Sequence, residues 1–231
     1  MKNFSKPIGL YPILDLDYCT LNSIEPENLI ELWESKSEYI PFFQLRGKSF
    51  SEKEYSDKYF YFLKKIKNLP IIINDFWKFA IREKAYGLHL GKEDFETLTR
   101  TEKEELFSSN IIKGTSSHSV SDLENLSPQD WDYSGIGPIF PTNTKRSDYP
   151  VLGAEFLNSA KLHSKIALAP IGGISENNLE SVFFSGNFFP ASISAFAKEK
   201  RFEKCISIIK KSLVQLERKT ENGNYEKNNY F

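Results

Sequence analysis

Short apolar runs alternate with longer amphipathic stretches along most of the chain, and this alternation constrains the fold more than any other feature. The runs are too short for helices and too apolar for strands that bury one face, which is typical of parallel strands covered on both faces. We expect strands at residues 8–14, 40–45, 70–73, 87–90, 111–113, 133–136, 166–169 and 191–193. Eight strand–helix alternations in 231 residues favour the α/β class and a single (β/α)₈ TIM barrel over an open sheet.

The stretches between the runs have the apolar spacing of helices. Residues 51–67 place Tyr55, Tyr59 and Phe62 on one face, with Ser51 as the expected N-cap. Further helices are expected at residues 26–36, 77–84, 102–108, 120–126, 154–163, 175–184 and 199–216. Residues 1–217 are predicted to form the barrel, and the polar residues 218–231 to form a disordered tail.

Composition excludes several classes of function. The net charge of −1 gives no global reason to expect nucleic acid or an anionic membrane as partner. Two cysteines provide neither a disulfide framework nor a four-ligand zinc pattern. No apolar stretch near the start is long enough for a signal peptide or a membrane span, so a cytoplasmic protein is predicted. A homo-oligomeric assembly is left open.

Polar residues capable of chemistry follow the expected strands. In a barrel the carboxyl ends of all strands share one face, where active sites are built. The opposite strand ends carry generic turn residues, and this asymmetry favours an enzyme. The polar residues are Gln44, Arg46, Lys48, Asn74, Asp75, His89, Asp94, Ser116, His118, Thr142, Thr144, Lys145 and Ser194, and two glycines, Gly172 and Gly173, follow the seventh strand.

Gly172 and Gly173 stand between the seventh strand and the expected helix start. Glycine lets the backbone approach an anion closely, and the first N–H groups of a helix bind anions. Barrel enzymes often place a phosphate there, beside the loop after the eighth strand, which here carries Ser194. The alternative is a tight turn that needs glycine for its conformation alone.

Asp75 and Asp94 lie on neighbouring loops and indicate a second sub-site. Two carboxylates, together with phosphate oxygens and waters, form a plausible Mg²⁺ site. Arg46, Lys48 and Lys145 add positive charge to the same face, where Thr142 and Thr144 add hydroxyl donors. Each residue on its own could equally be a solvated loop residue or a helix cap.

The face has two histidines, His89 and His118, each of which is either a structural hydrogen-bonding residue or a substrate contact. No nucleophile, base and acid form a convincing set. The site therefore favours chemistry carried by charge and positioning, as is usual for phosphate leaving groups.

Six motifs in order resemble the thiamine phosphate synthase family, which includes related thiazole tautomerases. Residues 133–145, YSGIGPIFPTNTK, are similar to the family's YxGxGPxFPTxTK stretch. The other motifs are QLRGK at 44–48, IND at 73–75, GLHLG at 87–91 followed by Glu93-Asp94, GTSSH at 114–118, and IGGI at 171–174. The resemblance runs from about residue 10 to residue 195.

The resemblance implies a reaction and roles for residues. The family joins 4-amino-2-methyl-5-hydroxymethylpyrimidine diphosphate to a thiazole phosphate and releases diphosphate. Catalytic roles would fall to Ser116, close to the reacting centre, and to Lys145. Asp75 and Asp94 would hold Mg²⁺; Arg46, Lys48, Asn74 and Lys145 would bind diphosphate; Gln44 and His89 would face the pyrimidine; Thr142, Thr144, Gly173, Ile193 and Ser194 would hold the thiazole phosphate.

Two positions depart from the family pattern. Phe76 replaces the usual Arg after Asn-Asp, and Lys92 replaces the usual Gln after His-Leu-Gly. Two alternatives therefore accompany the synthase hypothesis: a tautomerase-like isomerase that needs neither diphosphate nor metal, and a non-catalytic thiazole- or thiamine-phosphate-binding protein. The presence of Asp75, Asp94 and Lys145 argues against the tautomerase, because its chemistry has no diphosphate to hold.

Overall fold

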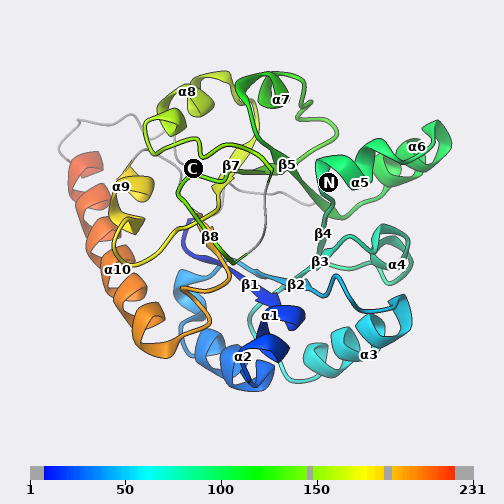
Figure 1. The fold of residues 1–231 in the computed structure, drawn as a ribbon. Coiled ribbons are helices and arrows are strands. Elements are labelled where there is room, and N and C mark those ends of the chain that lie inside the picture. Colours follow the sequence, from blue (N-terminus) through cyan, green and yellow to red (C-terminus); the bar gives the residue numbers. More distant parts are fainter. Residues whose placement is uncertain (1–7, 145–147, 185–188, 222–231) are drawn as a thin grey trace.

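A computed structural model describes residues 8–144, 148–184 and 189–221. Its strands form a ring with the helices outside, which confirms the (β/α)₈ barrel (Figure 1). All strand pairs are parallel. The strands are β1 (Tyr11–Asp15), β2 (Phe43–Arg46), β3 (Ile71–Asn74), β4 (Gly87–His89), β5 (Ile112–Ser117), β6 (Tyr133–Ile136), β7 (Ala167–Pro170) and β8 (Ala191–Ser192).

The ladders run in the order β7-β6-β5-β4-β3-β2-β1-β8. Strand β8 has only two residues and pairs with β1, with Tyr11 opposite Ala191. Within the described ranges no ladder joins β7 to β8, so the ring has a seam between these two strands. The sub-site expected at Gly173 and Ser194 lies next to this seam.

The helices cover the outside of the ring. Ser51 caps α3 through a capping box with Glu54, as its sequence position predicts. The helical segments are α1 (Leu16–Leu21), α2 (Pro26–Glu34), η1 (Ser37–Tyr39), α3 (Glu52–Leu63), α4 (Trp77–Arg82), α5 (Lys92–Glu96), α6 (Arg100–Ser108), α7 (Val120–Glu124), α8 (Phe156–His163), α9 (Leu179–Phe184) and α10 (Glu199–Glu221). None of these helices is long and apolar enough to cross a membrane.

Helices α1, α9 and α10 differ from the expected helices, and the first two differences have local causes. Helix α1 begins directly after β1 because the Asp15 side chain accepts a hydrogen bond from the Tyr18 backbone N–H. Helix α9 begins at Leu179 rather than at residue 175, since the Asn178 side chain accepts from Ser175 N and holds the preceding residues in a turn. Helix α10 continues to Glu221, beyond the predicted domain boundary at 217.

Two apolar clusters correspond to two layers. The larger lies between strands and helices and includes the fully buried Trp33. The smaller fills the inside of the ring and consists of Tyr11, Ile13, Phe42, Ile72, Ile112, Tyr133, Ala169, Phe189 and Ala191. Gly114 makes room for the Tyr133 ring, because a Cβ at this position would lie 2.0 Å from Tyr133 Cζ. The abundant aromatics therefore fill the core, as expected.

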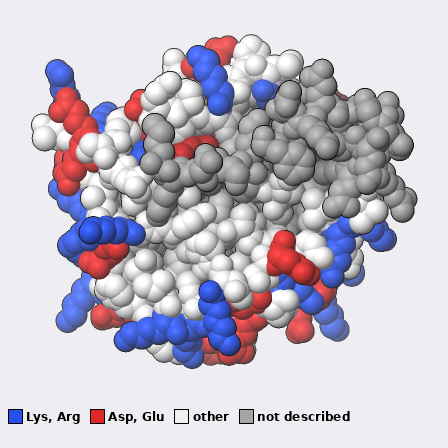
Figure 2. All heavy atoms as spheres, turned by 180° about the vertical axis from the view of Figure 1, so that it is seen from behind, with Lys and Arg blue, Asp and Glu red and all other residues white. Residues whose placement is uncertain are grey.

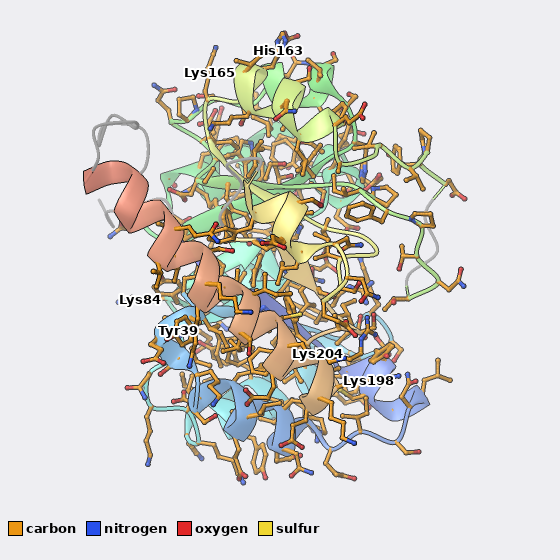
Figure 3. The ribbon with its side chains drawn as sticks, turned by 90° about the vertical axis from the view of Figure 1, so that its left-hand side faces the viewer. Tyr39, Lys84, His163, Lys165, Lys198 and Lys204 are labelled. Atoms are coloured by element: carbon orange, nitrogen blue, oxygen red, sulfur yellow. The ribbon has the colours of Figure 1, made fainter. Side chains whose placement is uncertain are left out.

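On the face opposite to the view of Figure 1, charged side chains of both signs lie along the left and lower edges, consistent with the near-zero net charge (Figure 2). His163, which has no expected role, lies at the outside of the helical layer (Figure 3). Its Nδ1 lies 2.7 Å from Glu124 Oε1, which links α8 to α7. The polar residues of interest for chemistry lie elsewhere, at the carboxyl ends of the strands.

Candidate active site

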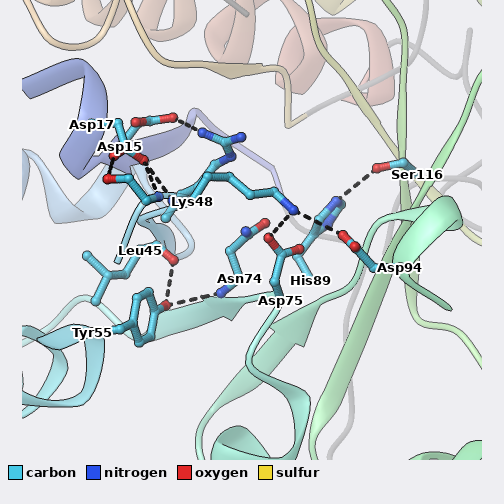
Figure 4. A network of polar contacts seen from close by, with 12 residues as sticks. Asp15, Asp17, Leu45, Lys48, Tyr55, Asn74, Asp75, His89, Asp94 and Ser116 are labelled. Atoms are coloured by element: carbon cyan, nitrogen blue, oxygen red, sulfur yellow. Dashed lines mark hydrogen bonds and ion pairs between the residues drawn. The ribbon is translucent and has the colours of Figure 1, made fainter. Parts of the chain in front are cut away.

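Lys48, Asp75 and Asp94 converge at the carboxyl ends of β2, β3 and β4 (Figure 4). Lys48 Nζ lies 2.6 Å from Asp75 Oδ2 and 3.1 Å from Asp94 Oδ2. The side chain of Asp75 is 20% exposed, whereas those of Lys48 and Asp94 are about half exposed. The structure thus brings together one cation and the two carboxylates that the sequence assigns to a metal.

Asp75 has an unusual backbone conformation, with φ of 65°, which non-glycine residues rarely adopt. Phe76 N donates to Asn74 O at 2.9 Å, which closes a tight turn around Asp75. Such conformations cost about 1–3 kcal/mol and persist where the surroundings enforce them. Burial raises the pKa of the Asp75 carboxyl above its ordinary value, although Lys48 acts in the opposite direction.

Arg46 forms an ion pair with Asp15, a buried residue at the end of β1. Asp17 accepts hydrogen bonds from the backbone N–H groups of Lys48 and Ser49 at 2.7 and 3.3 Å, and so shapes the loop after β2. Neither aspartate is among the predicted site residues, because none of those follows the first strand. Their position directly after an apolar run is the signal that would have identified them.

Five side chains inside the ring form a continuous row of hydrogen bonds. Gln44 Nε2 donates to Tyr11 Oη at 2.8 Å, and Tyr11 Oη lies 2.8 Å from Tyr133 Oη. His89 connects the row to β5, since its Nδ1 lies 3.2 Å from Tyr133 Oη and its Nε2 3.0 Å from Ser116 Oγ. Burial raises the pKa of both tyrosines above the ordinary value, so their hydroxyls are neutral. The row joins three predicted site residues to two tyrosines that the sequence indicated only as core.

The ends of β6, β7 and β8 form a second, mostly uncharged group. Thr144 Oγ1 donates to Ser194 Oγ at 3.2 Å, and Thr144 N donates to Thr142 Oγ1 at the same distance. Gly173 has φ of 65°, and a Cβ there would lie 2.5 Å from Pro141 O. Close packing of the β7 loop on the β6 loop therefore requires glycine, whether or not a phosphate binds there.

Three other predictions concern this group. Ile193 follows β8, and its carbonyl accepts a hydrogen bond from Ala197 N at 3.0 Å. Lys145 lies outside the described residues. The helix start expected immediately after the two glycines is wrong, because α9 begins six positions beyond Gly173, at Leu179.

The later part of the β6 loop, which includes Tyr149, contacts residues that follow β4 and β5. The Tyr149 ring stacks on His118 with centroids 3.6 Å apart, and its hydroxyl donates to Glu93 at 2.6 Å. Lys92 Nζ donates to Asp122 at 2.8 Å, and Asp122 also accepts from the His118 backbone N–H. Lys92 therefore pairs with α7 and does not replace charge beside Asp75.

Asp75 and Asp94 are suitable ligands for Mg²⁺. Their carboxylates already share one cationic group, Lys48 Nζ, so both can reach a common position. Carboxylate oxygen is the ligand that Mg²⁺ prefers, and this ion is commonly bound by one or two carboxylates plus substrate phosphates and water. Among the described residues no cluster of three or more acidic, histidine or cysteine side chains provides a complete metal cage.

Comparison with known proteins gives consistent results. The family model described as thiamine monophosphate synthase matches residues 10–196. The thiamine-phosphate synthase of Lysinibacillus sphaericus is 36% identical over 152 residues, covering 65% of this chain and 69% of that protein. That of Alkaliphilus oremlandii is 27% identical over 221 residues, covering 91% and 98%. The structure of thiamine phosphate pyrophosphorylase from Pyrococcus furiosus superposes with a TM-score of 0.72 at 26% identity, covering 90% of this chain and 98% of that one.

Proposed function

The chain belongs to the thiamine monophosphate synthase family, and we propose that it condenses 4-amino-2-methyl-5-hydroxymethylpyrimidine diphosphate with a thiazole phosphate. The products are thiamine monophosphate and diphosphate. The substrates are therefore small phosphorylated molecules. Among the alternatives, this reaction makes the fullest use of the charged residues at the ends of β2–β4.

The observation that carries the proposal is the convergence of Lys48, Asp75 and Asp94. A diphosphate leaving group needs cations around its oxygens, and carboxylates are needed only if a metal ion supplies part of that charge. An isomerase acting on a thiazole phosphate would have no use for such a cluster. The backbone strain at Asp75 also favours a functional role for this carboxylate.

The reaction forms one bond and breaks one. The thiazole nitrogen donates its electron pair to the pyrimidine methylene carbon, and the bond from that carbon to the diphosphate oxygen breaks. Mg²⁺, held by Asp75 and Asp94, would neutralise charge on the departing diphosphate. Arg46, Lys48 and Asn74 bind the same group from the carboxyl ends of β2 and β3, and Lys145 adds a further positive charge.

The remaining residues orient the two reactants. Gln44 and His89 face the pyrimidine, and the Tyr11–Tyr133 pair keeps their polar groups hydrogen-bonded inside the ring. Ser116, bonded to His89, lies near the reacting centre. Thr142, Thr144, Gly173, Ile193 and Ser194 hold the thiazole phosphate. The reaction proceeds by orientation and charge and needs no enzyme nucleophile, so Ser116 and His89 act by positioning the reactants.

A coupled assay for diphosphate release tests the proposal. Release is expected only with both substrates and Mg²⁺ present, and excess EDTA should abolish it until Mg²⁺ is restored. Full turnover in EDTA would contradict the metal assignment. Isomerisation of a thiazole phosphate without diphosphate release would favour the tautomerase, and calorimetric binding of thiamine phosphate without any turnover would favour a binding protein.

A further inference from the structure

Tyr55, on helix α3, reaches between the carboxyl ends of β2 and β3 (Figure 4). Its hydroxyl donates to Leu45 O at 2.6 Å and accepts a hydrogen bond from Asn74 N at 3.2 Å. The side chain is fully buried. Both partners are backbone groups of the strands whose ends carry the charged residues of the candidate site.

The hydroxyl bonds to both strands at the end of the β2–β3 ladder. These strands are paired from Phe43 opposite Ile71 to Leu45 opposite Ile73. In a parallel ladder with this register, Leu45 O and Asn74 N face each other across the two strands. The Tyr55 hydroxyl bonds to both of these groups and so ties the two strand ends to α3 at the point where β3 leads into Asp75.

The Tyr55 ring contacts the residue that follows Asp75 in the chain. It packs against the ring of Phe76 with centroids 4.5 Å apart and planes inclined by 43°. The hydroxyl thus bonds to the residue before Asp75, and the ring contacts the residue after it. Because Asp75 has φ of 65°, its conformation depends on neighbours that hold both flanking residues in place.

We infer that Tyr55 is a positioning residue that sets the orientation of the Asp75 carboxylate and thereby the affinity for Mg²⁺ and diphosphate. The inference rests on the proposed function and deepens it. It also gives a structural role to Phe76, the departure from the family pattern: the position contributes a ring that supports the Asp75 turn in place of a positive charge.

Tyr55→Phe tests the inference, because it removes only the hydroxyl. We expect the apparent Mg²⁺ activation constant and the KM for the pyrimidine diphosphate to rise about tenfold, the effect of about 1.4 kcal/mol. The KM for the thiazole phosphate should change less than about twofold, since the ends of β6–β8 are untouched. Calorimetry with inorganic diphosphate and Mg²⁺ should show the same loss of affinity without any turnover.

Tyr59→Phe is the matched control. Tyr59 lies one turn further along α3, is buried, and packs against Phe79 rather than at the strand ends. This variant should leave Mg²⁺ and diphosphate binding unchanged, even if its melting temperature falls. Equal melting temperatures and equal diphosphate affinities for the two variants and the wild type would overturn the inference, as would a loss of affinity of the same size in both variants.

Phe76→Leu provides a second test if Tyr55→Phe does not fold. It keeps the bridging hydroxyl and removes the ring contact, and we expect a smaller loss of diphosphate affinity, about threefold. Unchanged affinity in a folded Phe76→Leu variant would count against the inference. If the wild type releases no diphosphate in the coupled assay, the proposed function fails, whereas the calorimetric comparison still decides the role of Tyr55.

Discussion

The two halves of the candidate site consist of different kinds of residue. At the ends of β1–β4, charged side chains that follow or end different strands contact one another, with Lys48 bonded to Asp75 and Asp94 and Arg46 paired with Asp15. At the ends of β6–β8, the described residues are hydroxyls and glycines held by loop packing. The Gly173 position allows the β7 loop to approach Pro141 O, where a Cβ would not fit.

This difference matches the two expected ligands. A diphosphate with Mg²⁺ carries several charges, and its binding depends on the charges that face it. A phosphate monoester can be held by backbone N–H groups and hydroxyls, and its binding depends on the shape of the loops. Changes in the first half should therefore act through charge, and changes in the second through geometry.

The largest effect is expected in the charged half, from Asp75→Ala. Loss of the carboxylate leaves Lys48 without its closest partner and removes a proposed metal ligand, so kcat/KM should fall about 10³-fold or more. The coupled diphosphate-release assay measures the change. Asp57→Ala, at an exposed position of α3, removes the same charge away from the site and should leave activity unchanged. A loss of less than tenfold for Asp75→Ala would show that this half does not act through its carboxylates.

An intermediate effect is expected in the neutral half, from Gly173→Ala. The new methyl group would lie 2.5 Å from Pro141 O, so the β7 and β6 loops must separate, and the KM for the thiazole phosphate should rise about tenfold or more. Gly153→Ala is the control, because Gly153 also has a positive φ but has open space around its Cβ position. It should lower the free energy of unfolding by about 1 kcal/mol and leave the KM unchanged. Equal KM values in the Gly173→Ala and Gly153→Ala variants would show that loop packing at Gly173 does not control binding of the thiazole phosphate.

The smallest effect is expected from Thr144→Ala, which removes a single hydroxyl bonded to Ser194. The KM for the thiazole phosphate should rise about fivefold, as for one neutral hydrogen bond, and the KM for the pyrimidine diphosphate should not change. Thr101→Ala, at an exposed position of α6, controls for the loss of a threonine. A rise in both KM values would indicate that the two halves are coupled rather than separate.

The barrel could be predicted from sequence because its strands are buried on both faces and read as uninterrupted apolar runs. The short helices α1 and α5 could not, since each has too few residues for helical periodicity to appear. The start of α9 was misplaced because the Asn178 side chain accepts from the Ser175 backbone N–H and holds the residues before Leu179 in a turn. The cytoplasmic location and any homo-oligomeric assembly stay predictions.

Site residues were predictable where a polar side chain follows an apolar run. Lys48, Asp75 and Asp94 follow three different strands, and their proximity follows from barrel geometry alone. Tyr11 and Tyr55 were predicted only as core residues, because an aromatic residue in a buried position has the same sequence pattern whether or not its hydroxyl bonds to site residues. The partners of Arg46 and Lys92 were equally hidden, since a sequence does not show which of several nearby carboxylates a cation will face.

The row of hydrogen bonds from Gln44 to Ser116 crosses the inside of the barrel and links β2, β1, β6, β4 and β5 in turn. A hydroxyl has one hydrogen to donate. Tyr11 accepts from the Gln44 amide, and the hydrogen between Tyr11 and Tyr133 can lie on either oxygen. The tautomer of His89 decides whether its ring nitrogens donate to or accept from Tyr133 and Ser116. A change of tautomer at the histidine on β4 therefore reorients hydroxyl groups on β5 and β6 together.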